Sequence, residues 1–402
     1  MKRLSLLFTV LICSLYGFAQ ILSLKQVQKV AQTWFQQRLP SDFPEFSIKE
    51  TLPVINEGDT LFYAVNFYPK GFVMISASKK LHPIPAYSFD SWYTSENQPE
   101  NAKAWIEQYI HQAVYAHRTS SIPNQEAARQ WERLLDLEQG SKIKFSGKSV
   151  EPLTCADWNQ DWPYNEMCPV DPAGPGGHCY AGCVSTAIGL IMYYYRWPDT
   201  GVGYYSYTQS PYGLLEADFG NTHYAWEKMT NSINESDSAI AQLLYHIGVS
   251  CDLVYGPYGS GMYNHKAANA FRTHFKYSPE TQYVYRDSTT MDWDSLLTTH
   301  LDRKMPLYYA GWSVPDINGH AFVCDGYQGT GYYHFNFGWG GSFNGYYYTN
   351  NLTPGGSNFN LAQEIIINCH PDTVDYIYPN PSNEPENLTF KMGSIDDGSG
   401  PR

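Results

Sequence analysis

The residue of this chain best suited to nucleophilic chemistry is Cys183. It lies in the run GGHCYAGCVSTAIG, where apolar residues recur at helical spacing over 182–197 and Pro198 limits the helix. A thiol at the start of a helix lies near the positive end of the helix dipole, which favours the thiolate, and nearby N–H groups could stabilise an oxyanion. The alternative is a buried structural cysteine, but Gly182 indicates close approach of the backbone instead.

His320 is the expected general base for this thiol. It begins a predicted strand over 320–327 and follows Cys183 by 137 residues. Papain-like peptidases separate the two residues by about 130–150 positions, so the spacing favours this pairing. A Cys–His pair forms a thiolate–imidazolium couple that can attack an acyl carbon. His178 and His334 are the rival bases.

Asn336 could support this pair. It lies 16 residues after His320 in the run HFNFGWGG, where it could orient the imidazole ring or serve only as a turn residue at the end of a strand. The sequence leaves both roles open. No CxxC pair accompanies a second such pair or a His cluster, so we expect neither a metal nor a cofactor.

Composition restricts the class of protein. The 402 residues are 43% hydrophobic, which is enough for a large core and for two domains. The formal net charge is −13, and no basic cluster offers a surface for phosphates, so we expect no nucleic-acid partner. The 34 tyrosines and 11 tryptophans leave open a secreted glycan-binding protein.

The first residues have the form of a secretory signal. Lys2 and Arg3 precede an apolar stretch over 4–15, and small residues at 17–19 offer a cleavage site. The apolar stretch is too short to span a membrane, and no later segment has the form of a span. We therefore predict a signal peptide over 1–19 and a secreted or cell-surface protein.

Two further regions are expected after the signal. A helix over 23–38, a hairpin over 61–78 and a helical stretch over 102–137 together indicate a small α+β unit. The segment 138–150 carries lysines, glycines and serines and is typical of an exposed linker. Beyond it, helices precede strands, which indicates a second α+β domain. Its predicted elements are helices over 182–197 and 236–249 and strands over 306–312, 320–327, 332–339 and 345–349.

The motifs around these residues resemble those of the streptopain family of cysteine peptidases. The resemblance extends from about 60 to 370, and its most specific pieces are GCVSTAIGLIMYYYRWP, GHAFVCDGY and YHFNFGWGGSFNGYY. It implies a papain-like, two-lobed fold in which a helical half bears Cys183 and an antiparallel β-sheet half bears His320. Protein or peptide substrates would bind in the cleft between these halves. The resemblance also implies that Trp339 covers the pair and that 61–88 belongs to an inhibitory pro-domain.

One position departs from the pattern of papain-like enzymes. These enzymes carry a glutamine six residues before the nucleophile as a side-chain donor to the oxyanion, and here that position is Gly177. The second donor is therefore unassigned, with His178, Cys179 or another segment of the chain as candidates. The departure also leaves open a catalytically impaired pseudopeptidase, or a secreted binding protein that uses the same cleft for recognition.

Four regions follow from these patterns and from the resemblance. They are a signal peptide over 1–19, an inhibitory pro-domain with its linker over 20–148, a papain-like peptidase domain over 149–370 and a C-terminal tail over 371–402. The tail contains DYIYPNPSNEPENLTF, which resembles the opening of the sorting domain that Bacteroidetes use for export across the outer membrane. Its composition fits a disordered tail rich in Pro and Asn equally well.

The order of these regions predicts a latent precursor. A secreted peptidase with an accessible thiolate would attack its own export machinery, so the pro-domain is expected to act as an intramolecular inhibitor. A short tether gives it an effective concentration on the order of millimolar, so modest affinity would occlude the cleft. We expect activation by a cut between Gly140 and Glu151, with Lys148 as the favoured position. The alternative is an accessory domain that leaves the cleft open.

Overall fold

The structure is a computed structural model that describes residues 22–96, 98, 100–118, 125–136, 145–312, 319–329, 331–349 and 363–372. The predicted signal peptide and nearly all of the predicted tail lie outside these residues. The chain forms two compact units. The first contains Met1–Lys148, Gly331–Tyr333 and Ser342–Asn360, and the second contains Ser149–Thr330, His334–Gly341 and Leu361–Arg402.

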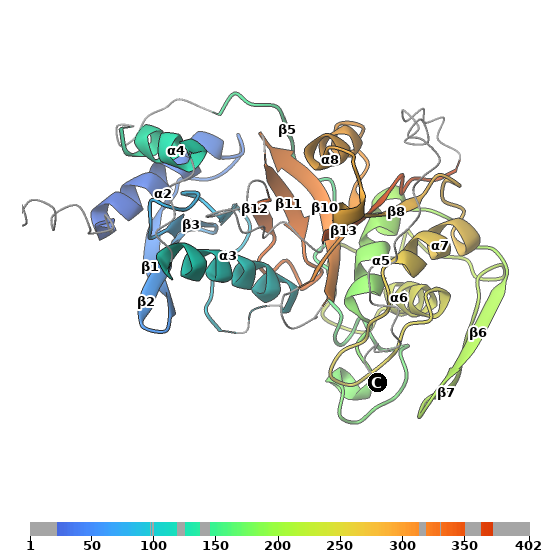
Figure 1. The fold of residues 1–402 in the computed structure, drawn as a ribbon. Coiled ribbons are helices and arrows are strands. Elements are labelled where there is room, and N and C mark those ends of the chain that lie inside the picture. Colours follow the sequence, from blue (N-terminus) through green and yellow to red (C-terminus); the bar gives the residue numbers. More distant parts are fainter. Residues whose placement is uncertain are drawn as a thin grey trace, which may run out of the picture. The chain divides into compact units, whose positions relative to one another are not determined.

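The first unit begins with the helix predicted over 23–38, which is α2, Leu24–Arg38 (Figure 1). Its start is a capping box, because the Gln26 N–H donates to the Ser23 hydroxyl and the Gln26 side-chain oxygen accepts the Ser23 N–H. One face of α2 is buried in the unit, as the apolar spacing predicts. The buried residues are Val27, Val30, Ala31, Thr33, Trp34 and Phe35.

An antiparallel sheet packs against α2. The predicted hairpin over 61–78 is confirmed as two paired strands, and the structure adds a preceding strand that the sequence reasoning missed. The strands are β1 Ser47–Asn56, β2 Asp59–Tyr68, β3 Phe72–Ser76 and β4 Ala86–Ser88, paired in this order. The next partner of β4 is β12, Gly345–Tyr348, which comes from far along the chain.

The helical stretch predicted over 102–137 is two helices and not one. They are α3, Glu100–Arg118, and α4, Gln125–Asp136. The sequence between them contains Pro123, which lacks the N–H that a continuous helix requires. The described residues 100–118 and 125–136 are helical, as predicted, and the residues between them lie outside the described part of the chain.

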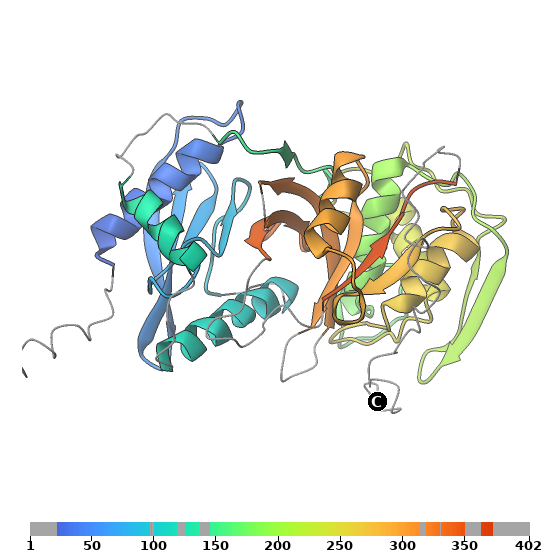
Figure 2. The same cartoon turned by 45° about the horizontal axis from the view of Figure 1, so that its top comes forward.

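The second unit combines helices with a second antiparallel arrangement of strands (Figure 2). The helices are α5 Cys183–Tyr195, α6 Ser238–Ser250, α7 His265–His274 and α8 Trp293–Asp302, with short 3-10 turns at Pro175–Gly177 and Arg286–Ser288. The strands pair in the order β5 Ser149–Val150, β10 Gly319–Gln328, β9 Leu307–Trp312, β13 Gln363–Ile367 and β8 Gln282–Tyr285. A separate hairpin joins β6 Tyr204–Gln209 to β7 Gly213–Asp218.

Two elements of the second unit are decisive for the chemistry. Helix α5 is buried along most of its length and lies against β10 in both views (Figures 1 and 2). It ends where Arg196 adopts a left-handed conformation, two residues before Pro198. Strand β11, Tyr332–Asn336, carries the chain from the first unit into the second.

Among the described residues, no helix is both long and apolar enough to cross a membrane.

Candidate active site

Cys183 is the first residue of α5, as the sequence predicts. Gly182 precedes it with a φ of 88°, a left-handed conformation that glycine adopts without steric cost. A side chain at Gly182 would also meet its neighbours, because an added Cβ would lie 3.0 Å from the Ser260 carbonyl oxygen. The glycine therefore permits the close backbone approach that the sequence indicated.

The thiol of Cys183 faces the strand that carries His320. The backbone N–H of Ala321, the residue after His320 in β10, donates to Cys183 Sγ across 3.4 Å. His320 itself pairs with Gly311 of β9 and is half-buried. Residues 137 positions apart in the sequence are thus brought to one junction between α5 and β10.

Burial acts against the thiolate that the sequence favours at Cys183. The sequence favoured a thiolate because of the helix dipole, but burial raises the pKa of the Cys183 thiol above its usual value. Hydrogen bonds from the backbone N–H groups of Ala321 and Val184 lower the pKa in part, and they do not outweigh burial. The sulfur therefore needs a base to remove its proton before it can act as a nucleophile.

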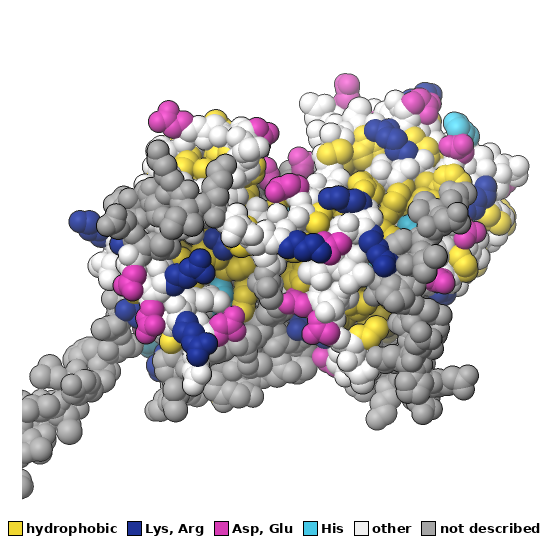
Figure 3. Space-filling model, turned by 90° about the horizontal axis from the view of Figure 1, so that it is seen from above, with side chains coloured by type: hydrophobic (Ala, Val, Ile, Leu, Met, Phe, Trp, Pro, Cys, Tyr) yellow, Lys and Arg dark blue, Asp and Glu magenta, His cyan; other side chains and the backbone are white. Residues whose placement is uncertain are grey.

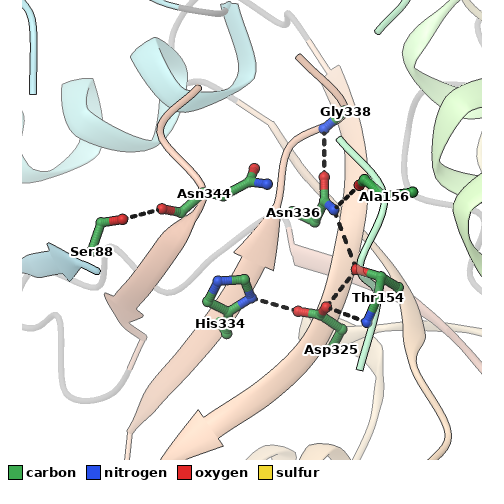
Figure 4. Close-up of polar contacts among 8 residues, drawn as sticks. All are labelled: Ser88, Thr154, Ala156, Asp325, His334, Asn336, Gly338 and Asn344. Atoms are coloured by element: carbon green, nitrogen blue, oxygen red, sulfur yellow. Dashed lines mark hydrogen bonds and ion pairs between the residues drawn. The ribbon is translucent and has the colours of Figure 1, made fainter. Parts of the chain in front are cut away.

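The two rival bases are held by other partners. His178 places Nδ1 2.8 Å from the carbonyl oxygen of Cys168. His334 is buried, and its Nδ1 lies 2.6 Å from Asp325 Oδ1 (Figure 4). Of the three histidines, His320 is the one whose neighbour in the chain donates to Cys183 Sγ, which favours it as the base.

Asn336 ends β11 and holds the turn that follows (Figure 4). Its side-chain NH₂ group donates to the Ala156 carbonyl oxygen across 2.9 Å and to Thr154 Oγ1 across 3.2 Å. Its side-chain oxygen accepts the N–H of Gly338 across 3.1 Å. These contacts give Asn336 the turn role that the sequence left open. The ring-orienting role stays a prediction, because the side-chain oxygen has a second lone pair that can accept an imidazole N–H.

The turn after Asn336 packs against the helix that bears the nucleophile. Gly338 has a φ of 68°, and an added Cβ would lie 2.7 Å from Thr186 Cγ2, in the first turn of α5. Trp339 follows and is half-buried. Its indole N–H is buried and has no hydrogen-bond acceptor among the residues that the structure describes. The turn therefore brings Trp339 to the same end of α5 as Cys183.

Gln160 is a candidate that the sequence reasoning missed. Its carbonyl oxygen accepts the N–H of Ala181 across 2.9 Å, two residues before Cys183. The side chain is only 6% exposed, and within the described part of the chain its Nε2 finds no hydrogen-bond partner. A buried amide donor on a segment bonded to the residues just before the nucleophile is a candidate to stabilise an oxyanion. The signal in the sequence is the glutamine of WNQDWPYN, which lies 23 residues before the nucleophile and not at the papain-like position, where Gly177 stands.

The described residues hold no group of three or more His, Cys, Asp or Glu side chains arranged to bind a metal ion. On the face drawn in Figure 3, Lys and Arg side chains stand mostly singly among uncharged and acidic groups.

Comparison with known proteins identifies the family. Residues 158–347 match the Peptidase C10 family, and residues 19–113 match the Spi protease inhibitor family. The chain belongs to the peptidase C10 family. Both the nucleophile candidate Cys183 and the base candidate His320 lie within the matched peptidase region.

Three relatives show how far the likeness extends. The chain is 28% identical over 381 residues to the thiol protease/hemagglutinin PrtT of Porphyromonas gingivalis, covering 89% of this chain but only 43% of PrtT. It is 28% identical over 337 residues to streptopain of Streptococcus pyogenes, covering 77% of this chain and 80% of streptopain. The solved structure of a Prevotella intermedia prointerpain A fragment matches with a TM-score of 0.62 and 27% identity, covering 79% of this chain and 97% of the fragment.

These comparisons decide between the functions that the sequence left open. The resemblance to the streptopain family is confirmed, as is the α+β fold in which a small N-terminal inhibitor region precedes a papain-like peptidase. The chain is a cysteine peptidase of the latent, inhibitor-bearing kind. The pseudopeptidase and the glycan-binding protein are not favoured.

Proposed function

We propose that this C10 peptidase hydrolyses peptide bonds of protein substrates, with Cys183 as the nucleophile and His320 as the general base and acid. The observation that carries the proposal is the contact between Cys183 Sγ and the N–H of Ala321, because it puts the residue after His320 against the sulfur. The raised pKa of Cys183 fits a thiol that gives up its proton only to an adjacent base.

The reaction follows from these roles. His320 takes the proton from Cys183, and the sulfur attacks the carbonyl carbon of the scissile bond. His320 then donates that proton to the leaving amine, which leaves an acyl group on the sulfur as a thioester. Water, deprotonated by the same imidazole, hydrolyses the thioester and regenerates the thiol. The backbone N–H of Cys183 and Nε2 of Gln160 stabilise the oxyanion in both halves of the reaction.

The remaining predicted residues have supporting roles. Trp339 covers the Cys183–His320 pair and limits access of water to it. Asn336 holds the turn that presents Trp339, through its contacts with Ala156 and Gly338. We propose 149–370 as the peptidase domain and expect no metal or cofactor in the reaction.

The N-terminal region acts as an intramolecular inhibitor in this proposal, over 20–148. Its strand β4 pairs with β12, where Tyr87 faces Tyr346 and Ala86 faces Tyr347. Strand β12 begins six residues after Trp339, and all but its last residue lie within the matched peptidase region. The inhibitor region thus pairs with the segment that continues from the proposed active-site turn. This pairing supports latency while the inhibitor region and the peptidase remain one chain.

The maturation cut is proposed at 146–148. Upstream, the N–H of Phe145 donates to the Gln37 carbonyl oxygen across 2.8 Å, which ties that end to the first unit. Downstream, Ser149–Val150 pairs with β10 of the second unit. The three residues between these anchors are exposed, so a proteinase can reach them without unfolding either unit.

Export is proposed from the sequence. The predicted signal peptide over 1–19 would direct the chain out of the cytoplasm, and the tail over 371–402 would direct export across an outer membrane. The mature peptidase would then act as a secreted or cell-surface enzyme on proteins or peptides outside the cell.

The nucleophile is tested by Cys183→Ala in the full-length chain, with Cys155→Ala as the matched control, because Cys155 is an exposed cysteine of the same unit. We expect Cys183→Ala to lower kcat/KM on a fluorogenic peptide by about 10⁴-fold or more. It should also abolish labelling by iodoacetamide at the active site. Equal hydrolysis by Cys183→Ala and Cys155→Ala would refute the assignment.

Latency is tested by placing the recognition sequence of a site-specific endopeptidase at 146–148. Peptide hydrolysis should be weak before the added endopeptidase acts and should rise as the 146–148 bond is cut. The same endopeptidase acting on the unmodified chain is the control. Full activity of the uncut protein would show that the N-terminal region leaves the cleft open.

A further inference from the structure

A single segment at the start of the second unit contacts every element that bears the proposed catalytic residues. We call residues 149–160 the strap. Its first residues pair as β5 with β10, and the Leu153 N–H donates to the Asp325 carbonyl oxygen across 3.0 Å. The Trp158 carbonyl oxygen accepts the Gly340 N–H across 3.0 Å. The Gln160 carbonyl oxygen accepts the Ala181 N–H across 2.9 Å. The strap therefore runs from the strand of His320, past the turn of Trp339, to the residues before Cys183.

Thr154 is the polar centre of the strap (Figure 4). Its backbone N–H donates to Asp325 Oδ2 across 2.9 Å, and its hydroxyl donates to the same oxygen across 2.5 Å. The hydroxyl oxygen in turn accepts from Nδ2 of Asn336 across 3.2 Å. One hydroxyl thus joins a carboxylate on β10 to the amide at the end of β11.

Asp325 has no exposure to solvent, and its second oxygen lies 2.6 Å from His334 Nδ1. Burial of a carboxylate is costly unless its oxygens are hydrogen-bonded, and here both oxygens are engaged. A buried network of this kind holds a single geometry, because loss of one member leaves its partners unsatisfied. Because burying this carboxylate and its partners costs free energy, the network indicates a role beyond holding the strands together.

The network ends at the turn over the active site. Asn336 accepts the N–H of Gly338, and Gly338 packs against Thr186 in the first turn of α5. A shift of Asn336 would therefore move Gly338 and Trp339 relative to Cys183. The geometry at this turn depends on Thr154, which lies far from it in the sequence.

We propose that Thr154 and Asp325 are positioning residues of the peptidase, which act through Asn336 on the turn that presents Trp339; the proposal rests on the catalytic roles proposed above. A consequence concerns maturation. The segment that contains Thr154 must remain attached after the linker is cut, so the mature chain must begin at or before Leu153. Trimming beyond Thr154 would inactivate the enzyme even with Cys183 and His320 intact.

The test compares Thr154→Val with Thr154→Ser in the full-length chain after its own processing. Valine keeps the shape but lacks the hydroxyl, and serine restores it. We expect Thr154→Val to lower kcat by about tenfold or more with little change in KM, since misplacement of a catalytic element acts on turnover. Thr154→Ser should recover most of the loss. The matched control is Thr281→Val, which removes another buried hydroxyl bond of the same unit, to the Asn368 carbonyl oxygen, away from the turn.

A double-mutant cycle with Asn336→Ala tests whether Thr154 acts through Asn336. The double variant should be no worse than the poorer single variant, because both substitutions break the same connection. Independent, additive losses would overturn the proposal, and so would a kcat for Thr154→Val equal to that of Thr281→Val. Inactivity of the wild type, or activity of Cys183→Ala, would instead refute the proposed function.

If Thr154→Val does not fold, the position of the mature N-terminus tests the proposal instead. Mass spectrometry of the active, processed wild type should show a first residue at or before Leu153. An active form that begins after Thr154 would overturn the proposal, because such a chain lacks the hydroxyl that joins Asp325 to Asn336.

Discussion

The two units differ in how the sequence supplies their cores. The first unit takes a large part of its core from residues beyond 330, since Tyr332, Tyr346 and Tyr348 are buried among side chains of the N-terminal region. The second unit draws its main apolar cluster largely from the continuous stretch 156–323. The inhibitor region therefore depends on a piece of the peptidase sequence to complete its sheet and core, whereas the peptidase assembles most of its own.

The contacts that matter also differ in kind. In the first unit, aromatic rings stack across the junction of β4 and β12, with Tyr87 and Tyr346 at 5.0 Å between ring centroids and His82 and Tyr348 at 3.7 Å. In the second unit, directional hydrogen bonds through Thr154 fix the active-site turn. Stacked aromatic rings tolerate small changes in orientation, so such a contact can form and separate without one exact geometry. This property suits an inhibitor that must dissociate. A catalytic turn needs one geometry, which directional bonds supply.

The largest expected effect lies in the second unit alone. His320→Ala should lower kcat/KM by about 10³-fold or more, because the thiol loses its base and the leaving amine loses its acid. Alkylation of Cys183 near neutral pH should also slow. His223→Ala, at an exposed histidine of the same unit, is the control. An unchanged alkylation rate in His320→Ala would show that the pairing is wrong.

The next effect lies in the first unit. Tyr87→Ala removes a fully buried ring that stacks on Tyr346 and should destabilise this unit by about 3–5 kcal/mol. We expect earlier processing and weaker latency. The kcat of the mature enzyme should stay unchanged, because residue 87 is lost with the inhibitor region. Tyr68→Ala, at a tyrosine 51% exposed in the same sheet, is the control. A lower kcat in the processed Tyr87→Ala enzyme would contradict the separation of roles between the units.

A smaller effect sharpens the assignment within the second unit. Gln160→Ala should lower kcat by about 10²-fold, as loss of one oxyanion donor does in other acyl-transfer enzymes. Alkylation of Cys183 by iodoacetamide should be unaffected, since that reaction forms no oxyanion at a carbonyl. Steady-state kinetics beside an alkylation time course measures both. Equal losses in the two reactions would indicate that Gln160 supports the fold of the site instead.

The smallest expected effect is the acid sensitivity of the first unit. Burial lowers the pKa of His82 to about 3, so the folded unit keeps this ring neutral, whereas an unfolded histidine titrates near 6.5. Protonation therefore favours the unfolded state, and the stability present above pH 6.5 is lost as the pH falls toward 3. We expect a loss of about 1–2 kcal/mol between pH 7 and pH 5.

The control for this pH effect is His82→Phe, which keeps a ring beside Tyr348 and cannot titrate. Histidines of the second unit, His246 and His300, also have pKa values lowered to about 4 by burial, and they are the same in both proteins. The difference between the two stability profiles from pH 7 to pH 5 thus isolates His82. Parallel profiles would show that His82 does not contribute.

Local pattern was enough for much of the fold. The capping box at Ser23, the β2–β3 hairpin, the start of α5 at Cys183 and the helix over 238–250 follow from spacing, capping residues and turn residues close together in the chain. The elements missed were those without a clear local period, such as β1 and the hairpin of β6 and β7. Strands β1 and β6 are partly exposed along most of their length, so no regular apolar alternation marks them.

The sequence by itself determined which residues could perform the chemistry, because a thiol at a helix start and a histidine at a strand start are local features. Only the tertiary structure decided what surrounds them. Burial raises the pKa of the Cys183 thiol, and the amide of Asn336 is engaged by the strap. Gln160 reaches the segment before the nucleophile from 23 positions upstream. The reason is physical: burial and hydrogen-bond partners are set by segments that meet only when the chain folds, so no spacing along the sequence can specify them.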